Sequence, residues 1–159
     1  MKYMGGKVRH AKEIVSTILS LSPNKTKWVE PFIGGGSVVT SVPKAFSIYG
    51  SDINLNVVEL FKYVAEGREL PDEITRETYM QVKQQPKNYA AWFVGFVSIG
   101  CSFGGKEWGG YGSGLNSKGL PRNYALETKN KLLSMDFSGI VFNTLDYQEV
   151  SVDKDCIVY

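Results

Sequence analysis

Apolar residues recur along the chain at two spacings, and these predict helices that alternate with short strands. A spacing of three or four residues predicts helices from Val8 to just before Pro23, from Asn54 to about Ala65, from Thr75 onward, and over 89–99 and 123–134, with a short helix between Ser37 and Pro43. Short apolar runs predict strands at 28–33, 45–49, 140–143 and 155–159. This alternation is typical of an α/β fold with a largely parallel sheet.

A glycine-rich segment separates the last helix and strands from the rest of the pattern. Residues 100–121 contain eight glycines and are expected to form a loop or an irregular hairpin. No linker divides the chain, so we expect 1–159 to be one domain. Within it, 1–60 and 136–159 would form the core, and about 66–135 a helical and loop insertion.

Composition limits the classes of protein that need considering. The chain has 159 residues, 43% of them hydrophobic and 13% aromatic, which excludes a disordered or collagen-like protein. No uncharged apolar run approaches the ~20 residues that a membrane-spanning helix needs. Two cysteines 55 positions apart favour a reduced, cytoplasmic protein. His10 is the only histidine, and no second metal-type ligand lies near it, so no metal is expected.

Charge is distributed unevenly between the two ends of the chain. Residues 1–27 carry six basic side chains and one acid, whereas residues 136–159 carry five acids and one base. A basic end can contact phosphate groups, but a solvated helix face has the same composition. The charge pattern alone leaves both interpretations open.

The most informative motif pairs a glycine turn with a later acid. One predicted strand runs into Gly34-Gly35-Gly36-Ser37, and the next ends at Asp52, 16 residues beyond Gly36. In a doubly wound sheet, ligands bind beyond the carboxyl ends of the strands, where glycines allow close approach and an acid can accept both ribose hydroxyls. The spacing fits neither Gly-x-Gly-x-x-Gly nor a P-loop. It therefore favours S-adenosylmethionine (SAM), a nucleoside cofactor without phosphate.

Three ordered motifs resemble the Dam-type, or D12 class, DNA adenine-N6 methyltransferases, and the phage members most of all. The motifs are Lys-Tyr-Met-Gly-Gly-Lys at 2–7, Glu-Pro-Phe-Ile-Gly-Gly-Gly-Ser at 30–37 and Ser-Asp-Ile-Asn at 51–54. The resemblance implies an incomplete Rossmann-like methyltransferase sheet, SAM as cofactor and double-stranded DNA as partner. It also implies a phage-type protein acting in the cytoplasm of a bacterial host. The cofactor contacts that it implies are Tyr3, Lys7, Phe32, Gly34, Gly36, Ser37, Asp52 and, less directly, Tyr147.

The glycine-rich segment interleaves aromatic and basic residues, a pattern that suits stacking on bases and contact with phosphates. A surface loop with packed aromatic side chains would have the same composition. In the family this region contains the target-recognition elements, although the segment here is shorter than the basic hairpin of bacterial enzymes. The DNA-contact residues expected on this basis are Lys7, Lys106, Trp108, Tyr111, Lys118 and Arg122.

The family's catalytic tetrapeptide, Asp-Pro-Pro-Tyr or a close variant, does not occur in these residues. All six prolines are isolated, and the sequence stops at Tyr159 in the strand that the tetrapeptide would follow. In the family, its side chain and a proline carbonyl accept the hydrogens of the adenine amine, and its aromatic ring stacks on the flipped base. We therefore expect no catalytic residue here, and an unpaired strand edge near Cys156–Tyr159 that pairs with a partner chain or a second copy.

Two functions from different classes remain open. The first is the SAM-binding, DNA-recognising portion of an adenine-N6 methyltransferase, with the catalytic motif supplied from elsewhere. The alternative is a catalytically inactive phage-type homologue that binds DNA or protein to inhibit a host defence complex. Another enzyme with a nucleoside cofactor is a weaker third possibility.

Overall fold

The computed structural model describes residues 1–159, which form a four-stranded parallel sheet with five α-helices. The strands are β1 (Lys27–Glu30), β2 (Ser47–Asp52), β3 (Ile140–Thr144) and β4 (Cys156–Val158). Their order in the sheet is β3-β2-β1-β4, and every neighbouring pair is parallel. The predicted α/β class is therefore confirmed.

Three of the five helices begin at a capping side chain. They are α1 (Ala11–Leu21), α2 (Leu55–Ala65), α3 (Arg76–Gln84), α4 (Ala91–Gly95) and α5 (Tyr124–Leu133). The side chains of Asn54, Thr75 and Asn123 accept hydrogen bonds from the first turns of α2, α3 and α5. Such bonds satisfy amide groups that the helix itself leaves without partners.

Two predicted helices differ in the structure. The segment 37–43 forms only a 3-10 turn over Val39–Ser41. The helix expected over 89–99 is α4 followed by a π-helical turn over Phe96–Gly100, in which the Cys101 amide donates to the carbonyl of Phe96. The spacing of apolar residues cannot distinguish α-helical, 3-10 and π-helical turns, because all three bury one side of the helix.

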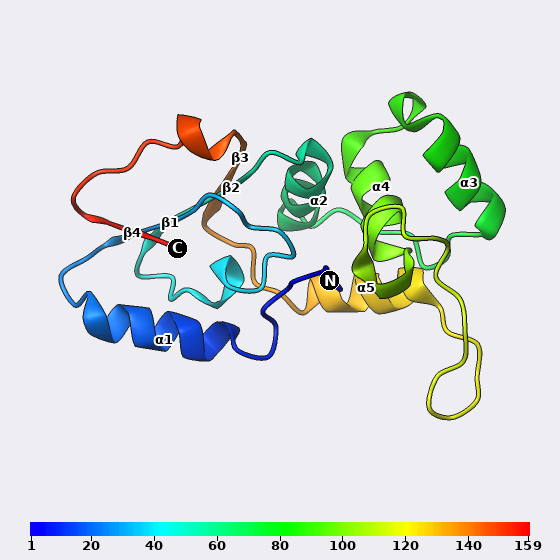
Figure 1. Cartoon of the computed structure of the whole chain (residues 1–159), viewed down its shortest axis with the longest axis horizontal. Coiled ribbons are helices and arrows are strands. Elements are labelled where there is room, and N and C mark those ends of the chain that lie inside the picture. The colour runs from blue at the N-terminus through cyan, green and yellow to red at the C-terminus, as the bar shows by residue number, and fades with distance from the viewer.

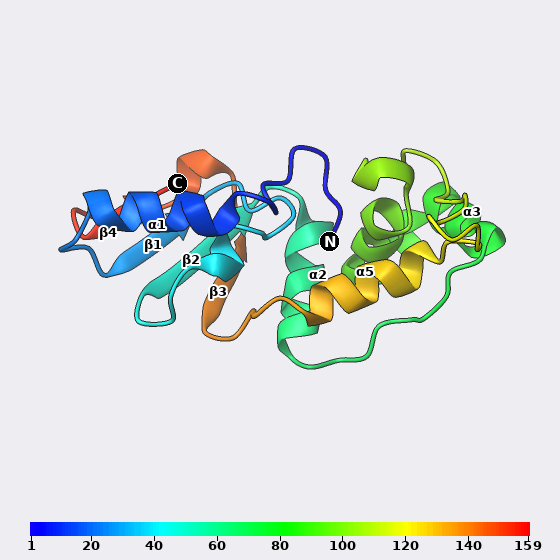
Figure 2. The ribbon, with the colours of Figure 1, turned by 90° about the horizontal axis from the view of Figure 1, so that it is seen from below.

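The molecule has two lobes joined through α2. The sheet and α1 form one lobe, α3, α4 and α5 form the other, and α2 lies between them (Figure 1). A view from below shows α1 running along the sheet and the N-terminal segment rising between the lobes (Figure 2). The carboxyl ends of β1 and β2 point toward α2 and the helical lobe, so any site at those strand ends lies near the junction.

The two faces of the sheet differ in how well they are covered. Trp28, Ile48 and Ile157 share one face in register and are buried in the main core, where α2 also contributes Phe61. On the opposite face, Tyr49, Val141 and Val158 lie in one row with Val29, and these three are exposed. In this structure Val29, in the middle of the row, is buried, and the other three side chains have little cover.

No helix is long and apolar enough to cross a membrane.

Helix α4 packs closely against the start of α2. A Cβ atom placed on Gly95 would lie 2.3 Å from the backbone oxygen of Asn56. No side chain fits at this distance, so the helices are packed through glycine.

We expect Gly95→Ala to destabilise the protein by about 1–3 kcal/mol, the usual cost of overpacking. Helix propensity alone would make this substitution stabilising by about 1 kcal/mol. The sign of the measured change therefore shows whether overpacking or helix propensity dominates. Urea unfolding measures it, with the exposed Asn130→Ala in α5 as control. A Gly95→Ala variant as stable as the parent would contradict this account of the packing.

Candidate cofactor site at the carboxyl ends of β1 and β2

The carboxylate of Asp52 joins the ends of the two central strands. It lies at the end of β2 and is buried. Its Oδ2 accepts a hydrogen bond of 2.9 Å from the amide of Gly34, and its Oδ1 accepts one of 3.0 Å from the amide of Asn54. One side chain therefore fixes both the glycine turn after β1 and the start of α2.

The glycines of the turn are required by conformation and by close packing. Gly34 and Gly36 have φ angles of 45° and 73°, in the left-handed region that favours glycine. A Cβ on Gly36 would lie 3.0 Å from the Phe61 ring, and one on Gly35 would lie 2.7 Å from the Cβ of Tyr3. The turn is thus packed against α2 on one side and against the N-terminal segment on the other.

A hollow of about 200 Å³ lies beside the turn. It brings together five of the predicted cofactor residues, Tyr3, Lys7, Phe32, Gly34 and Ser37. Asp52 does not line it. Pockets for small molecules commonly measure about 300–1,000 Å³, so the hollow is smaller than a site that encloses a nucleoside cofactor.

Two predicted cofactor residues that are far apart in sequence form an exposed aromatic pair. The rings of Phe32 and Tyr147 have centroids 5.4 Å apart at an interplanar angle of 34°. They are 67% and 54% exposed, which is unusual for large aromatic side chains in contact with each other. Tyr147 lies in the 3-10 turn after β3, whose start is fixed by a capping box between Asp146 and Glu149. The pair offers flat surfaces at the strand ends.

The N-terminal segment covers the open side of the turn. Burial raises the pKa of Tyr3, and the negative charges of Asp52 and Glu107 act in the same direction. The phenol therefore keeps its proton, and its hydroxyl stays a potential hydrogen-bond donor. Lys7 is exposed and donates a hydrogen bond of 2.8 Å to the carbonyl of Gly5.

Glu30 is a site residue that the sequence analysis did not single out. It ends β1, lines the hollow and is only 2% exposed, yet its Oε2 has no hydrogen-bond partner. Burial raises the pKa of this carboxyl group to about 8, and the nearby Trp28 side chain acts in the opposite direction. An acid at the end of a short buried strand is the signal that could have identified it.

The predicted DNA-contact residues lie in different environments. Lys106 and Lys118 are exposed on the glycine-rich segment. Trp108 and Tyr111 are half-buried and pack edge-on against Tyr79, at centroid distances of 5.6 and 5.7 Å.

The backbone around these aromatic residues is also fixed. The Tyr111 hydroxyl donates to the carbonyl of Ile74, and the Trp108 amide donates to that of Ser98 at a φ of 52°. In this structure the two rings pack within the helical lobe, and their stacking on bases remains a prediction.

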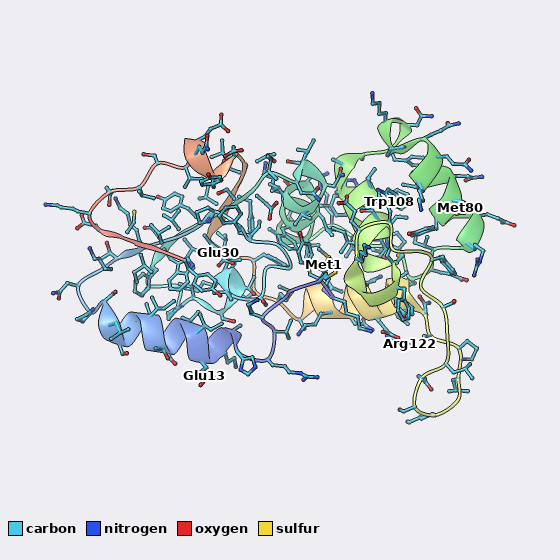
Figure 3. The ribbon with its side chains drawn as sticks, in the orientation of Figure 1. Met1, Glu13, Glu30, Met80, Trp108 and Arg122 are labelled. Carbon is cyan, nitrogen blue, oxygen red and sulfur yellow. The ribbon has the colours of Figure 1, made fainter.

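The positive charge of Arg122 is partly neutralised by a neighbouring acid. It forms an ion pair with Glu127 and lies over the ring of Tyr124, with its guanidinium carbon 4.3 Å from the centroid. Figure 3 shows Arg122 at the base of the glycine-rich segment and Trp108 inside the helical lobe. Of the predicted DNA contacts, Lys7, Lys106 and Lys118 are therefore exposed cations without an ion pair.

Comparison with known families assigns the chain. A sequence model of the D12 class N6 adenine-specific DNA methyltransferases matches residues 3–97, which is more than half of the chain. The chain belongs to this family. No curated protein matches the chain.

The matched segment contains the site that the geometry brings together. It includes the N-terminal segment from Tyr3, the glycine turn and Asp52, and it ends in the π-helical turn after α4. D12 membership accounts for the Rossmann-like parallel sheet and implies SAM as the cofactor and DNA as the substrate. Tyr147 and the glycine-rich segment lie outside the matched residues.

The raised pKa of Glu30 makes stability depend on pH. Between about pH 4.5 and 8 this carboxyl is ionised in the unfolded chain and protonated in the folded one, so the folded state binds more protons. We expect its contribution to the free energy of unfolding to be complete below pH 4.5 and lost progressively up to about pH 8. The loss amounts to a few kcal/mol, at ~1.4 kcal/mol per pKa unit.

Urea unfolding of the wild type and of Glu30→Gln at pH 5 and pH 8.5 tests this expectation. The wild type should lose stability relative to Glu30→Gln at the higher pH, because the amide does not ionise. The exposed Glu13→Gln in α1 serves as control. A stability difference between the wild type and Glu30→Gln that does not change with pH would refute the assignment.

Proposed function

We propose that this chain binds SAM at the glycine turn and recognises duplex DNA, as the cofactor-binding and DNA-recognising portion of an adenine-N6 methyltransferase. The observation that carries the proposal is the hydrogen bond from the Gly34 amide to the Asp52 carboxylate. It places the carboxylate beside the glycine turn, as a ribose site in a doubly wound sheet requires.

Asp52 retains the capacity to accept ribose hydroxyls. Each of its oxygens accepts one backbone amide, and an ionised carboxylate offers about four acceptor positions in all. The exposed pair of Phe32 and Tyr147 lies on the same edge of the sheet and would contact the adenine ring of the cofactor. Gly34, Gly36 and Ser37 would contact the methionine portion.

Glu30 extends this proposed site. Its unpartnered carboxyl lines the hollow together with Gly34 and Gly35. A cationic group of the cofactor placed there would favour the ionised carboxylate and pair with it. We propose that the small hollow enlarges when the Tyr3 ring moves away from the turn, since this ring packs against Gly34 and Gly35.

The division of the chain that the sequence predicts is also part of the proposal. Residues 1–60 and 136–159 would form the cofactor-binding core, and about 66–135 the DNA-recognition insertion. Methyl transfer also needs acceptors for the two hydrogens of the adenine amine, and these residues contain no Pro-Pro pair. We propose that a further segment, from the same or another chain, supplies these acceptors.

The free edge of β4 is where another strand could add. In this structure β4 pairs only with β1, and Val158 is exposed beside that edge. An unpaired edge beside an uncovered apolar row favours pairing with another strand, from a partner chain or a second copy. This pairing remains a proposal.

Cofactor binding gives the first functional test. We expect Asp52→Ala to weaken SAM binding at least about tenfold, since each hydrogen bond to a charged group is worth about 1.5–3 kcal/mol. Asp52→Ala also removes a hydrogen bond that supports the glycine turn, so a second variant, Tyr147→Ala, leaves the turn intact. We expect it to weaken SAM binding about fivefold or more, because stacking on the adenine ring is lost. Isothermal titration calorimetry measures both affinities.

Asp153→Ala, at the opposite end of the sheet, is the matched control and should bind SAM as the wild type does. If the wild type binds SAM and neither Asp52→Ala nor Tyr147→Ala changes its affinity, the cofactor lies elsewhere.

DNA recognition gives the second functional test. The double variant Lys106→Ala, Lys118→Ala should weaken binding to duplex DNA. The negative slope of log affinity against log salt should become shallower by about 2, at ~0.9 per phosphate contact. Fluorescence anisotropy over a salt series measures the slope. A double variant with the affinity and slope of the wild type would remove these lysines from the interface.

A further inference from the structure

A groove runs between the start of α1 and helix α5, on either side of Met1. It consists of two hollows of about 420 and 340 Å³, and four residues line both of them. These shared residues are Met1, Val8, Arg9 and Lys131. We call the two hollows together the Met1 groove. Figure 3 shows Met1 between the two lobes, above α5 and to one side of α1.

The Met1 residue at the centre of the groove is buried, and its α-amine carries no charge at neutral pH. The Met1 residue is 1% exposed, and its α-amine lies 3.5 Å from the Sδ of Met135. Burial, with a smaller contribution from the charge of Lys131, lowers the pKa of this amine to about 5. The positive charges of the groove therefore come from side chains on its walls.

Those walls carry more basic than acidic charge. Four basic side chains line the two hollows: Lys2, Arg9, Lys12 and Lys131. Three of them, Arg9, Lys12 and Lys131, are exposed and form no ion pair.

The acids of the groove are already occupied. Glu127 pairs with Arg122 and more distantly with Lys2, and Asp136 pairs with Lys44 at 3.4 Å. The three free cations are therefore not neutralised by the walls of the groove.

The cations reach this groove from separate parts of the chain. Arg9 and Lys12 flank the first residue of α1, whereas Lys131 comes from the last turn of α5. A solvated helix face would place its charges on one element and away from a shared hollow. Like charges that converge on one groove, whose acids are paired with other cations, repel each other, and the local potential attracts anions.

We propose that the Met1 groove is a second DNA contact, which holds the phosphate backbone of the duplex through cations other than Lys106 and Lys118 of the glycine-rich segment. The proposal rests on the proposed function, because it takes duplex DNA to be the polyanion that this chain binds. Charge complementarity selects this occupant: a row of phosphates supplies several anions at fixed spacing, which three free cations on two walls can contact together. Because the buried Met1 amine is uncharged at neutral pH, these contacts are left to the side chains.

The test compares charge removal inside and outside the groove. The triple variant Arg9→Gln, Lys12→Gln, Lys131→Gln should bind a duplex of about 20 base pairs at least tenfold more weakly at low salt. Its negative slope of log affinity against log salt should become shallower by about 2.7, at ~0.9 per contact. The charge-conserving variant Arg9→Lys, Lys131→Arg should keep the slope of the wild type.

The control is Lys25→Gln, Lys154→Gln, which removes a half-buried and an exposed cation where Lys25 contacts the segment before β4, at the far end of the sheet. Thermal unfolding of every variant confirms that the fold is retained. A shallower slope in the groove variant with an unchanged slope in the control supports the inference. The groove variant removes three charges and the control two, so an equal loss per charge removed in both variants would show a general charge effect and overturn it.

The remaining outcomes separate this inference from the proposed function. A groove variant that binds as the wild type does, alongside a weakened Lys106→Ala, Lys118→Ala variant, overturns the groove and leaves the proposed function standing. Wild-type protein that binds SAM but no duplex DNA overturns the groove together with the DNA part of the proposed function. A groove variant that binds DNA weakly while SAM affinity is unchanged places the effect at the DNA surface.

Discussion

The organisation of the candidate site depends on one buried carboxylate between two strand ends. Asp52 accepts amides from the turn after β1 and from the start of α2, so it sets the position of the glycine turn relative to the second strand. The two strands are parallel neighbours, so their carboxyl ends lie side by side, where a ligand binds in a doubly wound sheet. The same atoms that stabilise the turn are those that a ribose would need.

The N-terminal segment links this site to the helical lobe. Tyr3 packs on Gly35 of the turn, while the amide of Met4 donates a hydrogen bond of 3.2 Å to the carbonyl of Gly105. A Cβ on Gly105 would lie 2.5 Å from the carbonyl carbon of Lys2, so the contact is too close for any side chain. The N-terminal segment therefore contacts both the glycine turn and the glycine-rich segment.

Much of this architecture could be predicted from the sequence because local signals and tertiary structure agree. The caps Asn54, Thr75 and Asn123 begin the helices that they predict, and the glycine turn and Asp52 meet as strand order requires. The packing of the aromatic residues could not be predicted. The sequence suits a base-stacking loop or a packed one equally well, and the contacts of Trp108 and Tyr111 with Tyr79 appear only in the fold.

Two features of the site depend on distance in space and therefore leave no local pattern. Glu30 is unpartnered because of what covers the end of β1, and the Met1 groove gains its charge from residues that are more than one hundred positions apart. The π-helical turn after α4 depends in the same way on its neighbours, since a Cβ on Gly100 would lie 2.6 Å from the side chain of Thr128. Such features come from the fold as a whole.

A crystal structure of the protein with S-adenosylhomocysteine tests the central claim most directly. The account predicts both ribose hydroxyls within about 2.5–3.0 Å of the Asp52 carboxylate, the usual range for such bonds. It also predicts the adenine against Phe32 and Tyr147, with the Tyr3 ring displaced from the glycine turn. A ligand bound away from the carboxyl ends of β1 and β2, with Asp52 still contacting only backbone amides, would contradict it.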